Sequence, residues 1–413
     1  MRLYKQELKR LFHTKRIIVI FIFAVVMSAL LAILPSELSD ANYLDEEGNT
    51  IQLHGIEAIK FIEEKSYAGN GKVTAEQLKE ALQKYQDLYR EYGKDPLKGN
   101  LPLDIYWEEV APIRPLLRMI TTAYGTNERD ADLVSLKPSD MESFYKVCET
   151  RLEDAMKSDD ILNDPEYIGK AQAIYRKVEQ PFVVSHGYTR DALDYVSITI
   201  LLLVLLSVVM TAPVFAERYE SGEDSVIRCT VFGKGKLVRT TILATLTVSS
   251  LMYLVGIGLH LFISDMIFGI DTLKESVQVL YTVYSLPPLN LLGLQIVLAL
   301  TGWICCIATV VMATSISAIM RETSTAMVIS IVIVFLPTFI YMGIGSVNWL
   351  LAILPSASVG LSNNMLYSLV DLRFLRMGGT ILWYPVVLAI SDIIETAAFG
   401  IIAHFAYIRH QVR

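Results

Sequence analysis

The sequence is poor in charged residues and lacks the motifs by which proteins hold ATP or a catalytic metal. Only 19% of its 413 residues are charged, whereas 53% are hydrophobic, a balance that is unusual for a soluble protein. A phosphate-binding G-x-x-x-x-G-K-[ST] loop, an H-E-x-x-H zinc motif and a G-x-S-x-G nucleophile turn are all missing. A long basic tract is absent as well, which argues against nucleic acid as a partner. We therefore expect no enzyme activity, cofactor or metal site in this chain.

Cysteine is scarce, with four residues in the whole chain. Cys148 stands alone in a polar segment and Cys229 lies in a polar loop, while Cys305 and Cys306 are adjacent in an apolar run. No pair is spaced as in a disulfide framework. We interpret Cys305 and Cys306 as small apolar residues that fill space.

Hydrophobic residues are gathered into six runs, each long enough for a helix that crosses a bilayer. The first run has 18 residues and follows six Lys/Arg within the first 16 residues. A basic start before an apolar run is also typical of a cleaved signal peptide, but this run is longer than the usual hydrophobic core of one. We therefore predict an all-α membrane protein with six transmembrane helices, within residues 17–34, 196–215, 241–263, 289–314, 325–344 and 381–406.

Residues 36–192 form a polar insert between the first run and the other five. This segment holds 30 acidic and 19 basic residues, so it carries a formal charge of −11 while the rest of the chain carries +4. With 157 residues it is large enough to bury a hydrophobic core of its own. We predict a mostly helical domain here, in which the Pro-rich stretch 102–115 is irregular.

Three helices of the insert are indicated by their first turns. Thr74 and Gln77 have the spacing of a capping box, and Ser139 and Glu142 repeat it. Asp164 stands directly before a proline, a combination that is typical of a helix start. Apolar residues recur at helical spacing after each of these signals.

Positive charge is distributed unequally between the two sets of connecting segments. With the N-terminus in the cytoplasm, the cytoplasmic termini and short loops hold 14 Lys/Arg, whereas the short loops on the other side hold three. The insert is left out of this count because long domains cross the membrane largely regardless of charge. The positive-inside rule therefore predicts a multi-pass plasma-membrane protein with both termini cytoplasmic and the insert extracellular.

The most informative polar segment is the loop between the second and third runs, residues 216–239. Acidic residues come first, and Gly233 and Gly235 precede the basic residues that lead into the next run. Between them the pattern indicates a short apolar helix with Val226, Ile227, Val231 and Phe232. A short helix held at the membrane by its flanking spans can transmit force from a cytosolic partner. The pattern also fits an ordinary solvated loop that obeys the positive-inside rule.

This loop and the residues before it resemble the ABC-2 type permease family. The resemblance rests on Phe215, Glu217, Arg218 and Gly222, followed by a repeated glycine–lysine pair at 233–236. The six runs, the basic amphipathic N-terminus and the apolar loop before the last run are similar to that family as well. The large insert between the first two runs resembles its branch with a large extracellular domain.

The resemblance implies a permease that pairs with a second permease, of the same or a homologous sequence, and docks on separate ABC ATPase subunits that hold ATP and magnesium. Residues 1–16 would form an amphipathic elbow helix ahead of transmembrane helix 1 at 17–35. Helices 2–6 would follow within 193–413, with an interfacial loop at 345–380. The coupling loop 216–239 would contain a coupling helix near 221–233. The loop would contact the ATPase through Glu217, Arg218, Glu220, Gly222, Glu223, Asp224, Arg228, Phe232 and Gly233.

Two acidic residues, Asp392 and Glu395, lie near the middle of the last run, where a charged side chain costs roughly 2.5–3.5 kcal/mol on insertion scales. Their i, i+3 spacing places them on one helix face. We expect that face to contact other helices or a wet cavity. Either the pair belongs to the substrate path or to the seam with a second permease, or it hydrogen-bonds to Ser, Thr or Tyr and holds the last helix in its own bundle.

The predicted function is export of an amphipathic substrate, such as an antimicrobial peptide, a lipid-like molecule or a drug, energised by a separate ATPase. An acidic outer domain slightly favours cationic peptides, although salt screens that attraction beyond about 8–10 Å. The main alternative is a membrane receptor or immunity sensor that binds an extracellular ligand without transport. A cation-extruding permease is a third alternative.

Overall fold

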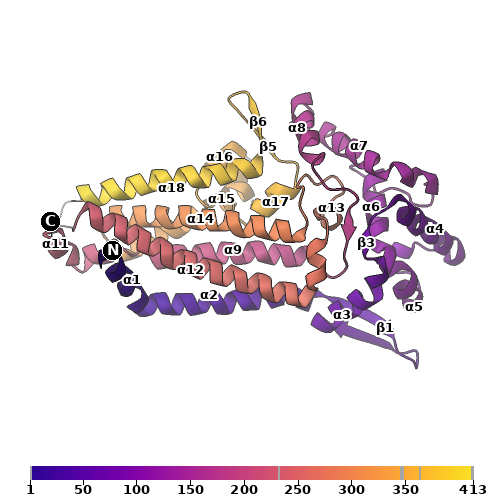
Figure 1. The fold of residues 1–413 in the computed structure, drawn as a ribbon, viewed down its shortest axis with the longest axis horizontal. Coiled ribbons are helices and arrows are strands. Elements are labelled where there is room, and N and C mark those ends of the chain that lie inside the picture. The colour runs from indigo at the N-terminus through magenta and orange to yellow at the C-terminus, as the bar shows by residue number, and fades with distance from the viewer. Residues whose placement is uncertain (1, 231–232, 345–347, 362–363, 411–413) are drawn as a thin grey trace.

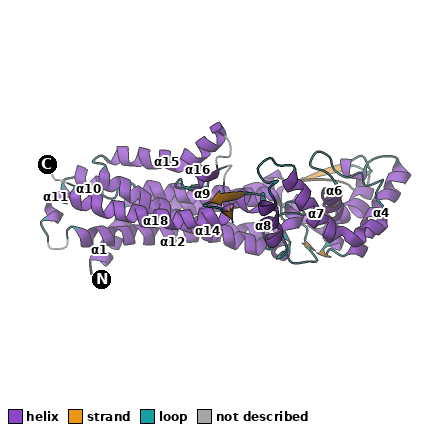
Figure 2. Ribbon diagram, turned by 90° about the horizontal axis from the view of Figure 1, so that it is seen from above, coloured by secondary structure: helices purple, strands orange, loops and turns teal. Residues whose placement is uncertain are grey.

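The computed structural model describes residues 2–230, 233–344, 348–361 and 364–410. The molecule is elongated, with long helices side by side along its length and the insert at one end (Figures 1 and 2). The N- and C-termini both lie at the opposite end, which we call the terminal end (Figure 1). The end that carries the insert is called the insert end.

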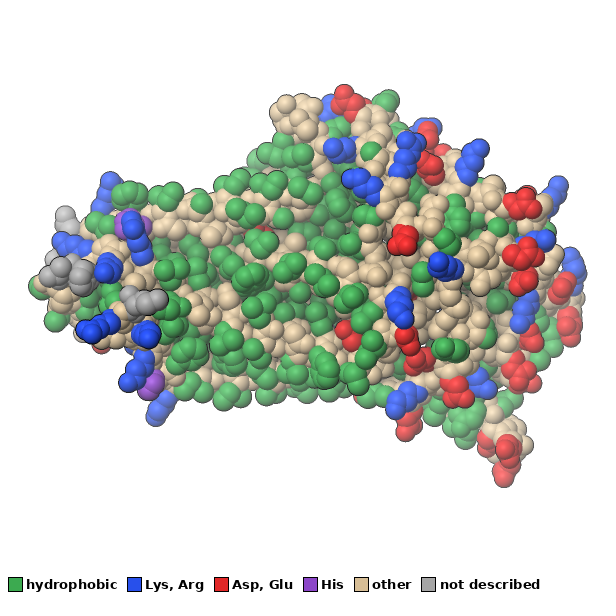
Figure 3. Space-filling view, viewed as in Figure 1, with side chains coloured by type: hydrophobic (Ala, Val, Ile, Leu, Met, Phe, Trp, Pro, Cys, Tyr) green, Lys and Arg blue, Asp and Glu red, His purple; other side chains and the backbone are tan. Residues whose placement is uncertain are grey.

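Six helices within the described residues are long and apolar enough to cross a membrane, which confirms the predicted all-α membrane protein. They are α2 (Lys15–Ile33), α9 (Arg190–Thr211), α12 (Gly235–Phe268), α14 (Leu291–Ile319), α15 (Thr323–Ile344) and α18 (Tyr384–Arg409). Their outward faces carry large apolar side chains such as Val19, Phe262 and Phe339, which are 63–65% exposed. Figure 3 shows hydrophobic side chains covering these helices, with charged side chains gathered at the two ends. A surface of this kind is suited to lipid rather than to water.

The spanning helices pack closely because small residues lie where they cross. α14 lies against α9, α12 and α18. A Cβ atom on Gly302 of α14 would lie 2.3 Å from the Tyr253 hydroxyl of α12, and one on Gly256 of α12 would lie 2.6 Å from a methyl group of Leu203 in α9. Small residues at such positions let membrane helices approach each other. A larger residue at either crossing would therefore displace these neighbouring side chains.

The insert is mostly helical, and its strands are short. Its helices are α3 (Gly55–Ser66), α4 (Ala75–Tyr92), α5 (Leu103–Ile105), α6 (Arg114–Tyr124), α7 (Phe144–Lys157) and α8 (Pro165–Tyr175). Antiparallel pairing joins β1 (Asp40–Leu44) to β2 (Thr50–His54), and β3 (Gly71–Lys72) to β4 (Val183–Val184). The β1–β2 register places Asp40 opposite His54, and their side chains lie 2.6 Å apart.

The remaining elements are short and lie at the ends of the bundle. At the terminal end are α1 (Arg2–His13), α10 (Ala216–Glu220) and α11 (Glu223–Arg228). At the insert end are α13 (Val277–Leu280), α16 (Asn348–Ala352), α17 (Met365–Val370) and the antiparallel hairpin of β5 (Phe374–Met377) with β6 (Thr380–Trp383). The described part of the predicted interfacial loop 345–380 thus holds α16, α17, β5 and the first residue of β6.

Two of the predicted helix starts in the insert are confirmed. Thr74 and Gln77 make the reciprocal bonds of a capping box at the start of α4. The Asp164 side chain accepts a hydrogen bond from the amide of Glu166 at the start of α8, where proline occupies the first turn. Both signals act through backbone donors that a helix leaves unpaired in its first turn.

Two other local predictions are wrong. The capping box expected at Ser139 and Glu142 is absent, because Lys137 and Asp140 cap a 3-10 helix over 138–143 and α7 begins after it. The stretch 102–115 is not irregular, because it passes through α5 and further helical turns into α6. Its prolines lie at a helix cap or in first turns, where the missing N–H is not needed.

The hydrophobic core of the insert includes segments that come from the other half of the chain. Val279 and Val283, from the connection between α12 and α14, are buried in it together with Phe374 of β5. The Tyr175 hydroxyl of α8 donates to the carbonyl of Val283 at 2.7 Å. Arg376 of the hairpin lies within 3 Å of two carboxylates at the start of α8. The insert is therefore joined to the spanning helices by packing as well as by chain connections.

Candidate functional site

The terminal end is built around α1, an amphipathic helix in which most charged residues are basic. Its residue Leu11 is buried in a hydrophobic cluster with Phe215, Leu237 and Val238. Glu7 is the single acidic residue of α1 and is only 7% exposed. A buried carboxylate requires compensating partners, and the neighbouring helices supply them.

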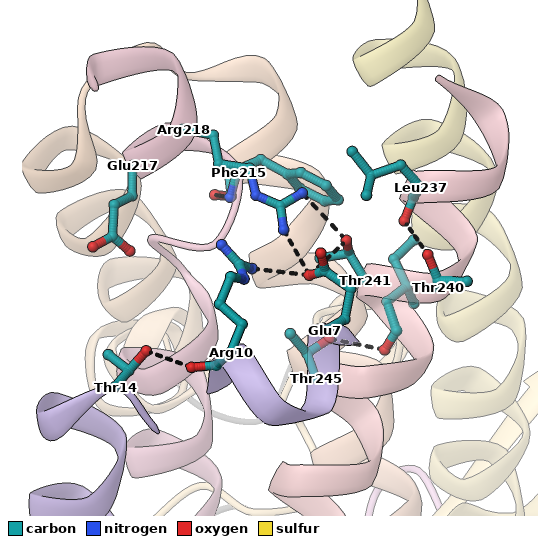
Figure 4. A network of polar contacts seen from close by, with 12 residues as sticks. Glu7, Arg10, Thr14, Phe215, Glu217, Arg218, Leu237, Thr240, Thr241 and Thr245 are labelled. Atoms are coloured by element: carbon teal, nitrogen blue, oxygen red, sulfur yellow. Dashed lines mark hydrogen bonds and ion pairs between the residues drawn. The ribbon is translucent and has the colours of Figure 1, made fainter. Parts of the chain in front are cut away.

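Glu7 is held by three side chains that converge on one of its oxygens (Figure 4). Arg218 of α10 donates to Oε2 of Glu7 at 2.6 Å, and the hydroxyl of Thr241 in α12 donates to the same oxygen at 3.3 Å. A guanidinium nitrogen of Arg10 lies 3.1 Å from it. We call Glu7, Arg10, Arg218 and Thr241 the ionic clamp. Because Arg218 is 2% exposed, the clamp fastens α1 to α10 and α12 from inside the protein.

Two arginines around one carboxylate leave the ionic clamp with an excess positive charge. Burial, followed by the charge of Arg218, lowers the pKa of Arg10 from its ordinary value, while Glu7 acts in the opposite direction. Arginine nevertheless stays protonated near neutral pH. Glu217 points away from the clamp (Figure 4), and it lies 3.4 Å from Arg16 with its side chain 54% exposed. Glu217 is therefore a surface residue, although it is next to Arg218 in the chain.

A second buried ion pair ties α11 to the last helix. Asp224 and Arg228, one turn apart, are joined to each other, and their side chains are 4% and 8% exposed. The Tyr407 hydroxyl of α18 donates to Oδ1 of Asp224 at 2.6 Å, and Arg228 donates to the Tyr407 carbonyl at 2.6 Å. The Arg228 guanidinium also lies 4.4 Å from the centre of the Tyr407 ring, in the geometry of a cation–π contact. We call these three residues the α11 anchor.

Glycine permits the turns on both sides of α11. Gly222 precedes the helix with φ of 76°, in the left-handed region that favours glycine. At Gly233, which follows it, a Cβ atom would lie 1.8 Å from the Ile227 carbonyl oxygen. The resulting helix has six residues and is shorter than the helix expected near 221–233. Phe232, one of the predicted ATPase contacts, lies outside the described residues.

The predicted coupling residues that the structure describes divide by burial. Buried side chains with partners in this chain belong to Arg218, Asp224 and Arg228. Gly233 is buried as well. Exposed positions are Glu217, Glu220, Gly222 and Glu223. Val226, on α11 beside them, is 71% exposed. We call these four exposed residues and Val226 the coupling face; the buried residues hold that face in place.

The carboxyl pair of α18 faces the interior of the protein. Asp392 is 2% exposed and Glu395 is 9% exposed. Ser358, between α16 and α17, donates to Asp392 at 2.9 Å, and Ser391 donates to Glu395 at 3.3 Å. Because α18 begins later than the apolar run in the sequence, the pair lies only about two to three turns from the insert end of the helix. The Ser358 contact joins α18 to the segment predicted as an interfacial loop.

Sequence reasoning missed the residues that hold these sites together, above all Glu7 and Tyr407. For Glu7 a signal was present, because it is a lone carboxylate among six Lys/Arg in the first 16 residues. Such an exception on an amphipathic helix indicates an ion pair with another element. Tyr407 gave no comparable signal, since tyrosine near the end of a spanning helix is equally suited to the membrane interface.

The fold defines a multi-pass helical membrane protein with a polar face at the terminal end and a large insert at the other end. The family model for ABC-2 family transporter protein matches residues 1–367. The chain therefore belongs to the ABC-2 transporter family, whose members are the membrane transport component of an ABC transporter and not its ATPase. This confirms the predicted permease family and a role in transport. No match was found among curated proteins.

Proposed function

We propose that the chain is the permease subunit of an ATP-driven exporter, and that the coupling face docks on a separate ABC ATPase. The observation that carries this proposal is the ionic clamp. It joins α1 to α10 and α12, while the α11 anchor joins α11 to α18. The elements around the coupling face are therefore fastened to two spanning helices, α12 and α18, so a displacement of that face would be transmitted to the bundle. ATP and magnesium would be held by the ATPase.

The docking proposal is tested by co-purifying the chain with nucleotide-binding subunits and measuring substrate-stimulated ATP hydrolysis. Glu223→Lys and Val226→Asp change exposed side chains of the coupling face. We expect both variants to stay in the membrane but to lose most of the stimulation and of the transport. The matched control is Glu128→Lys, a charge reversal at an exposed position of the insert. Full stimulation and transport in the Glu223→Lys variant would refute docking at this face.

Glu217 and Arg218 are expected to behave differently in the same assay. Reversing Glu217 changes a surface residue paired with Arg16, so a loss of stimulation would report on docking. Reversing Arg218 would place a second negative charge beside buried Glu7, and we expect it to disrupt the fold. If reversal at Glu217 leaves both stimulation and transport intact, its role is confined to the local pair with Arg16.

We also propose that the terminal end faces the cytoplasm and the insert faces outward. At the terminal end the charged side chains in view are mostly Lys and Arg, whereas at the insert end Asp and Glu lie among Lys and Arg (Figure 3), a distribution that agrees with the positive-inside rule. Cys229 is an exposed thiol in the coupling loop, whereas Cys148, Cys305 and Cys306 are buried. The native chain therefore carries a probe of its own orientation.

An impermeant maleimide should leave Cys229 unlabelled in intact cells and label it after permeabilisation. A Lys94→Cys variant, changed at an exposed position of the insert, should be labelled in intact cells. Labelling of Cys229 without permeabilisation would contradict the orientation. Bound ATPase should slow the labelling of Cys229, which gives a second readout of docking.

The substrate is proposed to be amphipathic, and a second permease, identical or homologous, is proposed to complete the membrane unit. Family membership and the lipid-facing apolar surface support both proposals. The competing receptor function predicts ligand binding without any change in ATP hydrolysis by co-purified subunits. Stimulation of that hydrolysis by a candidate substrate therefore separates the two functions.

A further inference from the structure

A cavity of about 830 Å³ lies where the insert meets the spanning helices. The insert contributes Arg114 and Arg118 of α6, and Arg190 is the first residue of α9. Glu275 comes from the segment before α13, and Val279 comes from α13 itself. The cavity therefore has walls from both halves of the molecule.

The three arginines of this cavity lack a carboxylate partner within the described part of the chain. Arg114 donates to the Tyr106 hydroxyl at 3.0 Å, and Arg190 donates to two backbone carbonyls, including that of Tyr281 at 2.5 Å. Burial, followed by the charges of Arg190 and Arg114, lowers the pKa of Arg118 from its ordinary value. The Arg118 guanidinium therefore lies close enough to Arg190 and Arg114 to be repelled by both. Arg114 and Arg118 are exposed and Arg190 is half-buried, so an anion can reach all three and would relieve that repulsion.

The acidic residues that line the same cavity do not neutralise these arginines. The Asp40 side chain is 57% exposed and lies 2.6 Å from His54, so water screens its charge. Glu275 is 4% exposed, and burial raises its pKa well above the ordinary value, which favours the uncharged form. One of its oxygens, Oε2, has no hydrogen-bond partner. Asp191 is the remaining acid, and it is exposed, so positive charge is in excess.

Apolar side chains line another part of the cavity. They include Trp107, Val279 and Leu280, which are 7–9% exposed. Guanidinium groups match phosphate geometry through paired N–H donors, while the apolar wall offers nothing to a free inorganic ion. A ligand that fits both parts must carry an anionic group and an apolar portion.

We propose that this cavity binds an amphipathic anion whose phosphate-type group is held by Arg114, Arg118 and Arg190. Its apolar portion lies against Trp107 and the last two residues of α13, Val279 and Leu280. The inference deepens the proposed exporter function, on which its meaning for transport rests, by naming anionic amphipaths as the substrate class. The cavity joins both halves of the molecule, so an occupant would contact the insert and a spanning helix at once.

The test uses the purified full-length chain, exchanged into amphipol, and isothermal titration calorimetry with dioctanoyl phosphatidic acid. Dioctanoylglycerol has the same tails without the charge, and inorganic phosphate has the charge without the tails. We expect the phosphatidic acid to bind more tightly than either. The Arg114→Gln/Arg118→Gln double variant should raise its Kd by about tenfold or more, since hydrogen bonds to charged groups contribute that much.

The matched control is Arg129→Gln, at an exposed insert position that does not line the cavity. It should keep the native Kd, and the thermal unfolding curves of all variants should coincide so that a lost fold is recognised. Equal binding of the charged and uncharged lipids, binding of inorganic phosphate as tight as that of the lipid, or an unchanged Kd in the folded double variant would each overturn the proposal. No ATPase is present in this assay, so its failure leaves the docking proposal standing, and a failure of docking leaves this binding intact.

Discussion

The arginines at the two ends of the molecule differ in whether they are bonded to a carboxylate of the same chain. At the terminal end, Arg218 and Arg228 are buried and each is bonded to a carboxylate of the same chain. At the insert end, Arg114, Arg118 and Arg190 line a cavity without such a partner in the described residues. Pairing within the chain makes rigid structure, whereas unpaired charge around a cavity leaves binding capacity for a ligand. The role of an arginine therefore depends on its counter-charge more than on its burial.

Removal of Glu7 should be the most disruptive single change at the terminal end. Glu7→Ala leaves Arg218 buried without its carboxylate, and breaking a buried pair in this way costs about 3–5 kcal/mol. We expect a correspondingly lower free energy of unfolding, measured by denaturant titration in detergent with circular dichroism. The control Glu217→Ala removes an exposed carboxylate and should change stability by less than about 1 kcal/mol. Equal effects of the two variants would show that the ionic clamp is not structural.

The cavity at the insert end should make stability depend on pH through His186. Burial lowers the pKa of His186 from 6.5 to about 4, and its backbone and ring N–H groups both donate to Asn70. The unfolded chain therefore takes up the proton first, so this contribution is complete above pH 6.5 and is lost as the pH falls toward 4. By pH 5 the loss amounts to about 2 kcal/mol.

Thermal unfolding of the full-length chain at pH 7 and pH 5 measures this effect. His186→Asn should shrink the difference between the two pH values, because the group that titrates is gone. His54→Asn, at an exposed position of the same insert, should keep it. An undiminished pH effect in His186→Asn would assign the dependence to other groups.

A smaller effect is expected from loosening the α11 anchor. Tyr407→Phe removes the hydroxyl that donates to Asp224 but leaves the ion pair with Arg228, so the cost is about 1 kcal/mol. Looser attachment of α11 should show as faster maleimide labelling of Cys229, which lies just after this helix. Tyr4→Phe removes a hydroxyl bonded to Thr247 on the neighbouring surface and should leave the labelling rate unchanged. Equal rates in the native and Tyr407→Phe chains would contradict the anchoring role.

The smallest effect is expected between the two ends, at the carboxyl pair of α18. Asp392→Asn with Glu395→Gln keeps size and hydrogen bonding but removes charge. If the pair serves mainly to hold α18 through Ser358, stability should change by less than about 0.5 kcal/mol and transport should continue at the native rate. Ser358→Ala, which removes the donor to Asp392, should destabilise more. A clear loss of transport in the double variant would instead place charge in the substrate path.

The spanning helices could be predicted from the sequence because each apolar run carries its own signal. Their ends could not, since α9 starts at Arg190 and α12 starts at Gly235, both in polar sequence ahead of the apolar run. Of the candidate site, the exposed acids of the coupling face follow from local charge. The partner of Arg218 does not, because Glu7 lies 211 positions away and such pairing leaves no periodic trace.

The arginine cavity beside the insert could not be predicted from the sequence either. Arg114 and Arg118 are one turn apart on α6 and share a face, but the surrounding prolines favoured an irregular segment. Arg190 reaches them only through the tertiary fold, from the start of a spanning helix. Local sequence patterns thus identify helices and exposed surfaces. A cluster of charged residues that are distant in the sequence can be recognised only from the three-dimensional structure.

α12 runs for 34 residues without interruption, which corresponds to about 51 Å at 1.5 Å per residue. The hydrocarbon layer of a bilayer is only about 30 Å thick, so this helix extends beyond it. Thr241 near its beginning belongs to the ionic clamp, and the carbonyl of its last residue, Phe268, lies where a Cβ atom on cavity-lining Gly187 would be 2.6 Å away. The helix contains no proline. α12 therefore sets a fixed distance between the ionic clamp and the cavity. The two polar ends can change their relative positions if α12 tilts, but the distance along α12 between them stays the same.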